Sequence, residues 1–142
     1  MRLSAWLVPL MLTAAPALAQ PRAFNCVGAE QLEDDVFVVP FGRGSAAVTD
    51  QARTPLAAAA ELAKANPERN LCVLGHSGQE GGAVTNTRLA AQRAGAVAQA
   101  LAARGVERDR VRAEARSAQF SPRVRAELPP ARMVTIVVLP AR

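Results

Sequence analysis

The side chain best suited to chemistry is an arginine, Arg93, within an otherwise apolar helical pattern. Asn86 precedes it by seven residues, or two helical turns, so we expect both polar side chains on one helix face. The remainder of that face is apolar and consists of Leu89, Ala96, Val97, Ala100 and Leu101. A buried guanidinium requires an anion or several hydrogen-bond acceptors. Arg93 is therefore expected either to anchor an anionic ligand or to be satisfied internally, by carbonyls or by an acid such as Glu80.

The sequence offers little for catalysis or metal binding. It contains one histidine, His76, and two cysteines, and its carboxylates are not clustered. Nucleophilic catalysis would require a nucleophile, a base and an orienting acid, whereas Ser77 is merely the next residue along the chain. We therefore expect a non-catalytic protein without a metal or another cofactor, in which His76 is a structural loop residue.

Six predicted elements must position these side chains. Runs of β-branched and apolar residues predict strands, and apolar residues at helical spacing predict two helices. The order strand, helix, strand, helix, strand, strand predicts an α/β (α+β) sandwich, with helices layered on a mixed four-stranded sheet. The expected ranges are a strand at 36–39, a helix from an N-cap at Thr49 to 65, a strand at 71–74, a helix from a cap at Asn86 to 104 with Gly105 as its C-terminal cap, and strands at 111–115 and 133–139.

The stretch from residue 75 to residue 101 resembles the core of the OmpA-like (OmpA/MotB C-terminal) peptidoglycan-binding domain. That family's pattern is a strand, Gly-His-Thr-Asp, a short loop, an asparagine and a helix containing Leu, Arg-Ala and Val. The residues that fit it without a gap are Gly75, His76, Asn86, Leu89, Arg93, Ala94 and Val97. Ser77 replaces the threonine conservatively, whereas Gly78 stands in place of the aspartate. The resemblance covers residues 36–139 and is thin after residue 111. The segment 36–49 is similar to the family's opening strand and turn, with Ser45, Ala46, Val48 and Thr49 in matching places.

The resemblance implies a ligand and a set of residues that bind it. In the family, the arginine corresponding to Arg93 pairs with a carboxylate of diaminopimelate in the peptide stem of peptidoglycan. The implied ligand-binding residues here are His76, Ser77, Gly78, Glu80, Asn86, Arg93 and Arg132. Gly78 cannot supply the family's carboxylate, and Glu80 is the acid closest to it in sequence. The alternative is a degenerate member that has lost the ligand and serves as a protein-interaction or structural module of the envelope.

The first residues have the pattern of an export signal. Arg2 is followed by a short apolar run and by Ala17-Leu18-Ala19, a typical cleavage sequence. We expect residues 1–19 to be a cleaved signal peptide, residues 20–35 an N-terminal arm, and residues 36–142 the OmpA-like domain. The apolar run is too short to span a membrane, so a periplasmic protein without a transmembrane segment is expected, soluble or peripherally associated with the envelope.

Export also bears on the cysteines and on the net charge. In an oxidising compartment Cys26 and Cys72 are expected to form a disulfide, although Cys72 alone could be a small buried hydrophobe. The formal net charge is +5, but export argues against a nucleic-acid partner and leaves the envelope polymer or other envelope proteins. The later arginines are expected to form a solvated basic face: residues 104, 108, 110, 112, 116, 123, 125 and 132.

Overall fold

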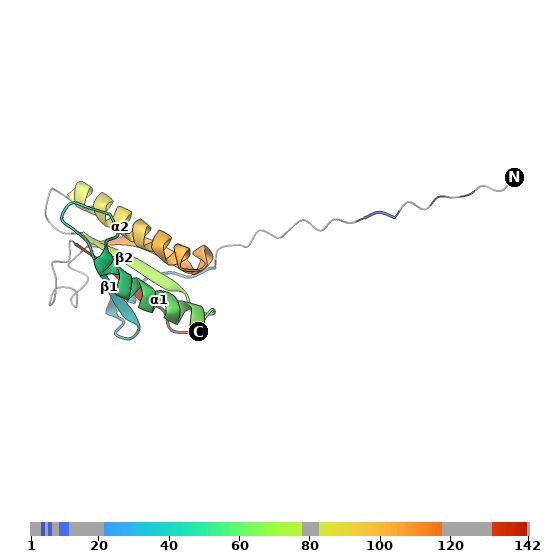
Figure 1. The fold of residues 1–142 in the computed structure, drawn as a ribbon, viewed down its shortest axis with the longest axis horizontal. Helices are drawn as coiled ribbons and strands as arrows, with labels where there is room; N and C mark the ends of the chain where they lie inside the picture. Colours follow the sequence, from blue (N-terminus) through green and yellow to red (C-terminus); the bar gives the residue numbers. More distant parts are fainter. Residues whose placement is uncertain are drawn as a thin grey trace.

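The computed structural model describes residues 4, 6, 9–11, 22–77, 83–117 and 132–141. Its regular elements combine four strands, two α-helices and three short 3-10 turns within those ranges (Figure 1). In chain order they are η1 (Ala29–Gln31), β1 (Val36–Pro40), η2 (Asp50–Ala52), α1 (Arg53–Ala65), β2 (Leu71–Ser77), α2 (Ala83–Ala103), η3 (Arg108–Arg110), β3 (Val111–Ser117) and β4 (Met133–Val138).

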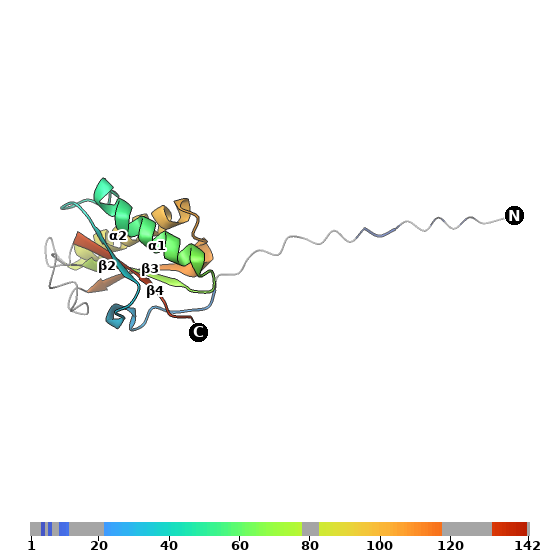
Figure 2. The same ribbon diagram turned by 60° about the horizontal axis from the view of Figure 1, so that its bottom comes forward.

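The strands form one mixed sheet in the order β1-β4-β2-β3. β2 and β3 are parallel, and β4 lies between β1 and β2, antiparallel to both. Both α-helices cover the same face of this sheet, whereas the residues before β1 run along the other face (Figure 2). The predicted α+β sandwich with a mixed four-stranded sheet is confirmed.

The helix-covered face holds the larger core. Because side chains alternate along a strand, Leu71 and Val73 of β2 face the helices, as do Val134, Ile136 and Val138 of β4. From the helices, α1 contributes Leu56, Ala59, Ala60 and Ala63, and α2 contributes Ala94, Val97 and Leu101. The small alanines allow both helices to lie close to the sheet, which suits a chain with only 4% aromatic residues.

Both helices begin at residues other than those predicted. Thr49 precedes the 3-10 turn η2 and makes no side-chain capping bond, and α1 begins at Arg53. This start makes Pro55 the third helical residue, where the missing N–H would have had no partner inside the helix. α2 begins at Ala83, so Asn86 lies inside the helix, and the prediction that it caps α2 is wrong.

The end of α2 follows the prediction. Gly105 has φ +95, a left-handed conformation that glycine adopts at little cost. Its N–H donates to Ala102 O at 3.0 Å, and the N–H of Val106 donates to Leu101 O at 3.1 Å. These two bonds form a Schellman motif, which satisfies carbonyls that the helix end would otherwise leave open.

The N-terminal arm forms a third layer on the open face of the sheet. The predicted disulfide is present: Cys26 and Cys72 are joined with Cα atoms 5.8 Å apart, and both side chains are buried. Ala29 packs with this bridge, and Phe24 and Leu32 border the same apolar cluster. The arm therefore packs against β2 and β4 through Phe24, Cys26, Ala29 and Leu32, whereas Val27 between them is exposed.

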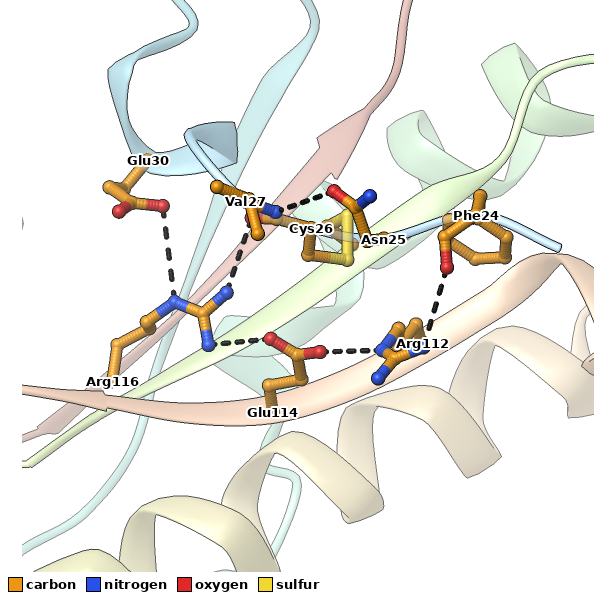
Figure 3. The surroundings of a disulfide bond; sticks show 9 residues. Phe24, Asn25, Cys26, Val27, Glu30, Arg112, Glu114 and Arg116 are labelled. Atoms are coloured by element: carbon orange, nitrogen blue, oxygen red, sulfur yellow. Dashed lines mark hydrogen bonds and ion pairs between the residues drawn. A yellow bond between two sulfur atoms is a disulfide. The ribbon is translucent and has the colours of Figure 1, made fainter.

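Charged side chains of the edge strand β3 also hold the arm (Figure 3). Arg116 donates to Cys26 O at 3.2 Å and lies 3.9 Å from the Glu30 carboxylate. Arg112 donates to Phe24 O at 3.3 Å. Glu114 joins the two arginines through contacts of 2.5 Å to each. Burial raises the pKa of Glu114, but the hydrogen bonds from Arg112 and Arg116 outweigh it, and the pKa is lowered.

The prediction of a solvated basic face is wrong for Arg110. Its side chain is 0% exposed, and it donates to Ala63 O, Asn66 O and Arg69 O at 2.7–2.9 Å. Arg116 is also partly buried, whereas Arg108 and Arg112 are exposed. Positions 123 and 125 lie outside the described residues. Within the described ranges, no helix is long and apolar enough to cross a membrane.

Candidate ligand-binding site

Arg93 is buried against the segment that follows β1. Its side chain is 2% exposed, although it belongs to α2. Nε donates to Ser45 O at 2.7 Å, and Nη2 donates to Gly42 O at 3.0 Å. The guanidinium carbon lies 5.6 Å from the ring centroid of Phe41, which adds a cation–π contact. These contacts fix the plane of the guanidinium relative to the 41–45 segment.

The 41–45 segment is itself held to the start of β4. The N–H of Phe41 donates to Arg132 O at 2.7 Å. Ser45 N donates to Gly42 O at 3.2 Å and closes a turn in which Gly44 has φ +67. The end of β1, the start of β4 and the first half of α2 therefore meet around Phe41, which is itself 6% exposed.

Asn86 lies on the same side of α2 as Arg93, as its spacing predicts. Its side chain is 8% exposed. The sequence therefore places both polar groups correctly on the buried face of α2, with Asn86 in its first turn and Arg93 at its midpoint. Of the predicted binding residues, the structure joins Arg93 and Arg132 through Phe41. Asn86 lies on the same buried face of α2, two helical turns before Arg93.

His76 and Ser77 lie in β2, since this strand continues to Ser77; the prediction of a loop position for His76 is wrong. Gly75 faces α2, so alternation directs His76 to the opposite face, the one that the arm covers. There His76 Nε2 lies 2.7 Å from Thr135 Oγ1. Ser77 Oγ donates to Arg116 O at 3.1 Å. The structure therefore places the His76 ring on the other face of the sheet from the Arg93 guanidinium.

The histidine is neutral at ordinary pH. Burial lowers the pKa of His76 to about 4, and the charge of Arg116 adds to this effect. His76 and Thr135 are 1% and 5% exposed, so neither is accessible to a substrate. The described residues include no group of three or more metal-binding side chains that could hold an ion. This hydrogen-bonded pair is accordingly part of the packing between β2 and β4.

Gly75 has a packing role that sequence reasoning did not assign. A Cβ atom at this position would overlap the carbonyl oxygen of Ala90 in α2. Glycine thus allows the backbone of α2 to lie directly on β2, which sets the depth at which Arg93 is buried. Gly78 and Glu80 lie outside the described residues. Gly78 stands in place of the family's aspartate, and Glu80 is the acid nearest to it in sequence.

Sequence reasoning also missed the partners of Arg93. Gly42 and Ser45 accept these hydrogen bonds through main-chain carbonyls. Every residue has such a carbonyl, so the sequence does not reveal which ones accept. The cue available was the match of the 36–49 segment to the family's opening strand and turn. The general prediction that carbonyls could satisfy Arg93 agrees with these two contacts.

The fold and the site define a small α+β domain with a buried arginine at one end of the sheet. The model of the OmpA family matches residues 40–132, and this chain belongs to the OmpA family. No curated protein matches the chain.

Several solved structures share the fold. The peptidoglycan-associated lipoprotein from Burkholderia pseudomallei has a TM-score of 0.62 and 25% identity, over 72% of this chain and 90% of that one. The cell wall anchor of the T6SS from Pseudomonas aeruginosa has a TM-score of 0.55 and 24% identity, over 73% and 80%. The periplasmic domain of Helicobacter pylori MotB has a TM-score of 0.56 and 19% identity, over 74% of each chain.

Proposed function

We propose that this chain is a non-catalytic domain of the cell envelope that binds the peptide stem of peptidoglycan beside Arg93. The observation that carries the proposal is the buried arginine itself, in a member of the OmpA family and at the position where the resemblance implies the ligand-binding arginine. A peptidoglycan-associated lipoprotein is among the structures that share the fold, at 25% identity. The proposed ligand group is a carboxylate of diaminopimelate.

The geometry of Arg93 suits this role. Its bonds to Gly42 O and Ser45 O hold the guanidinium in one orientation. A guanidinium of fixed orientation loses little entropy when it binds a planar carboxylate. Asn86, on the same helix face, is proposed to contribute a neutral hydrogen-bonding group at the edge of the site.

The proposed location follows from the same function. Residues 1–19 are proposed to direct export and then to be removed, which would place the domain in the periplasm with the polymer. The Cys26–Cys72 bridge agrees with an oxidising compartment. The proposal does not require other envelope proteins as partners.

Sedimentation with purified peptidoglycan tests the proposal. The wild-type chain, residues 20–142, is expected to pellet with the polymer. Arg93→Lys keeps the charge but not the two-carbonyl fork, and Arg93→Ala removes both, so binding should fall in that order. Arg104→Gln, a change beyond the far end of α2, is the control for loss of one positive charge. The folded fraction of each variant, from circular dichroism, normalises the pelleted amount.

The outcomes distinguish two roles of Arg93: a ligand anchor, which binds a carboxylate of the peptide stem, and an internal strut, which only stabilises the fold through its bonds to main-chain carbonyls. An anchor predicts that Arg93→Ala loses binding per folded molecule, whereas a strut predicts a loss of thermal stability with binding proportional to the folded fraction. If the wild type does not pellet with peptidoglycan, the proposed ligand is wrong. A protein-interaction module of the envelope then becomes the better function.

Position 78 provides a gain-of-function prediction. Gly78→Asp restores the family's carboxylate and should strengthen binding of a diaminopimelate stem peptide by about 1–3 kcal/mol, since it adds an acceptor for the ligand's amine. Calorimetric titration of the wild type, Gly78→Asp and Glu80→Ala measures this. If Glu80→Ala weakens the wild type and Gly78→Asp adds little, Glu80 already provides that acceptor.

A further inference from the structure

Three adjoining pockets lie at the end of the sheet opposite the candidate ligand-binding site. At this end β2 and β3 begin and β4 ends, since Leu71 pairs with both Val111 and Val138. Phe24 of the arm borders the first and second pockets, and Pro140 borders the second and third. The three pockets therefore form one surface, which runs across this end of the domain from β3 toward the start of β1.

The two outer pockets carry opposite charges. Among the described residues, the basic pocket is lined by three arginines and one acid: Arg22, Arg108, Arg112 and Asp109. The acidic pocket is lined by three acids and one arginine: Glu33, Asp34, Asp35 and Arg69. The net charge is therefore +2 in the basic pocket and −2 in the acidic pocket. A partner surface of a single charge sign is repelled by one of the two pockets, whereas a partner with both signs fits both.

The central pocket lies between them and has an exposed valine at its border. Its volume is about 410 Å³, and it is lined in part by the apolar residues Phe24, Val27, Leu139 and Pro140. Glu68 also lines it and is exposed to water. Val27 is 87% exposed. Since a cavity of about 150 Å³ holds a benzene molecule, the central pocket has room for a valine side chain of another molecule.

We propose that this surface binds a second copy of the chain in an isologous dimer. The two-fold axis passes near the central pockets, so that Val27 of each protomer enters the central pocket of the other. The same rotation places the basic pocket of each protomer opposite the acidic pocket of the other. Burial of the two valines contributes affinity, and the opposite charges fix the orientation. Both candidate ligand-binding sites remain accessible, because they lie at the other ends of the two sheets.

Sedimentation-equilibrium ultracentrifugation of the oxidised chain, residues 20–142, tests the proposal. The wild type is expected to convert from monomer to dimer between about 1 µM and about 1 mM, the range in which a weak dimer dissociates. Val27→Asp should raise the dissociation constant by about tenfold or more, because a charge replaces the buried valine. Val48→Asp is the matched control, since Val48 is also exposed but lies outside the three pockets, and it should stay within about twofold of the wild type.

A charge swap tests the orientation of the two protomers. Arg108 and Asp34 are both exposed, and Arg108 is chosen because the other two arginines of the basic pocket donate to main-chain carbonyls. Arg108→Asp and Asp34→Arg each place like charges opposite one another, so each should weaken the dimer by about tenfold. The double variant restores opposite charges and should return to within about threefold of the wild type. Circular dichroism checks that every variant is folded.

Three results would each overturn the proposal. The first is a wild type that stays monomeric up to about 1 mM, and the second is a dimer that Val27→Asp leaves unchanged. The third is a double variant that dimerises no better than either single variant, because the charged pockets then do not face each other. No peptidoglycan is present in these measurements, so their outcome does not depend on the proposed function.

Discussion

Arg110→Met is expected to be among the most destabilising single changes outside the ligand site. Arg110 joins the end of α1, the turn after it and the start of β3, because its guanidinium donates to the carbonyls of Ala63, Asn66 and Arg69. Its fourth bond goes to the exposed carboxylate of Glu107 at 3.0 Å. Methionine retains most of the aliphatic volume but donates no hydrogen bond.

The magnitude follows from the three main-chain bonds. A hydrogen bond from a charged donor contributes about 1.5 kcal/mol or more, so the loss of three costs about 5 kcal/mol. Removal of a buried cation offsets part of this loss, and the exposed bond to Glu107 contributes little. A net loss of about 3 kcal/mol remains, which is large for a domain whose total stability is about 5–15 kcal/mol.

Urea unfolding of the oxidised protein measures this loss. The midpoint should fall while the denaturant slope stays constant, because the area exposed on unfolding hardly changes. Arg108→Met, the same change at an exposed neighbour in η3, is the control and should alter the free energy of unfolding by less than about 0.5 kcal/mol. If Arg110→Met lies within about 1 kcal/mol of wild type, the three carbonyl bonds do not stabilise the fold as argued.

Three further predictions concern β2. The pKa of His76 is lowered to about 4 in the folded protein, so its neutral form stabilises the fold fully above pH 6.5, and about 3 kcal/mol of the free energy of unfolding is lost as the pH falls from 6.5 to 4. In urea unfolding, the free energy of unfolding of His76→Gln should depend less on pH over this range than that of the wild type, and an equal dependence would contradict the role given to His76. Reduction, or Cys26→Ala with Cys72→Ala, should cost about 4 kcal/mol for the loop of 46 residues, and an unchanged midpoint would exclude a stabilising bridge. Gly75→Ala should cost at least about 2 kcal/mol, because the new methyl group meets Ala90 O, whereas Gly95→Ala, where space is open, should be neutral or stabilising.

Pattern and spacing were sufficient for the elements and for the face on which Arg93 and Asn86 lie. Periodicity identifies a buried face because apolar side chains recur with the period of the element. The sequence could not show that Arg110 is buried while Arg108 is exposed, because its acceptors are carbonyls of segments distant in the chain. The predicted strand at 71–74 was also three residues shorter than β2, which ends at Ser77, because Gly75-His76-Ser77 has no β-branched residue to extend the strand pattern.

The arm also determines how the domain would transmit a mechanical load. The Cys26–Cys72 bond joins the segment before β1 directly to β2, which lies inside the sheet between β4 and β3. Tension applied to the chain before Cys26 passes through the covalent bridge into β2, so residues 27–71, including β1 and α1, lie in a closed loop that the force does not stretch. β2 ends at Ser77, at the end of the sheet where Arg93 is buried. A pull between the arm and a partner held at that end therefore acts along β2, and the backbone hydrogen bonds to β3 and β4 resist it together in shear.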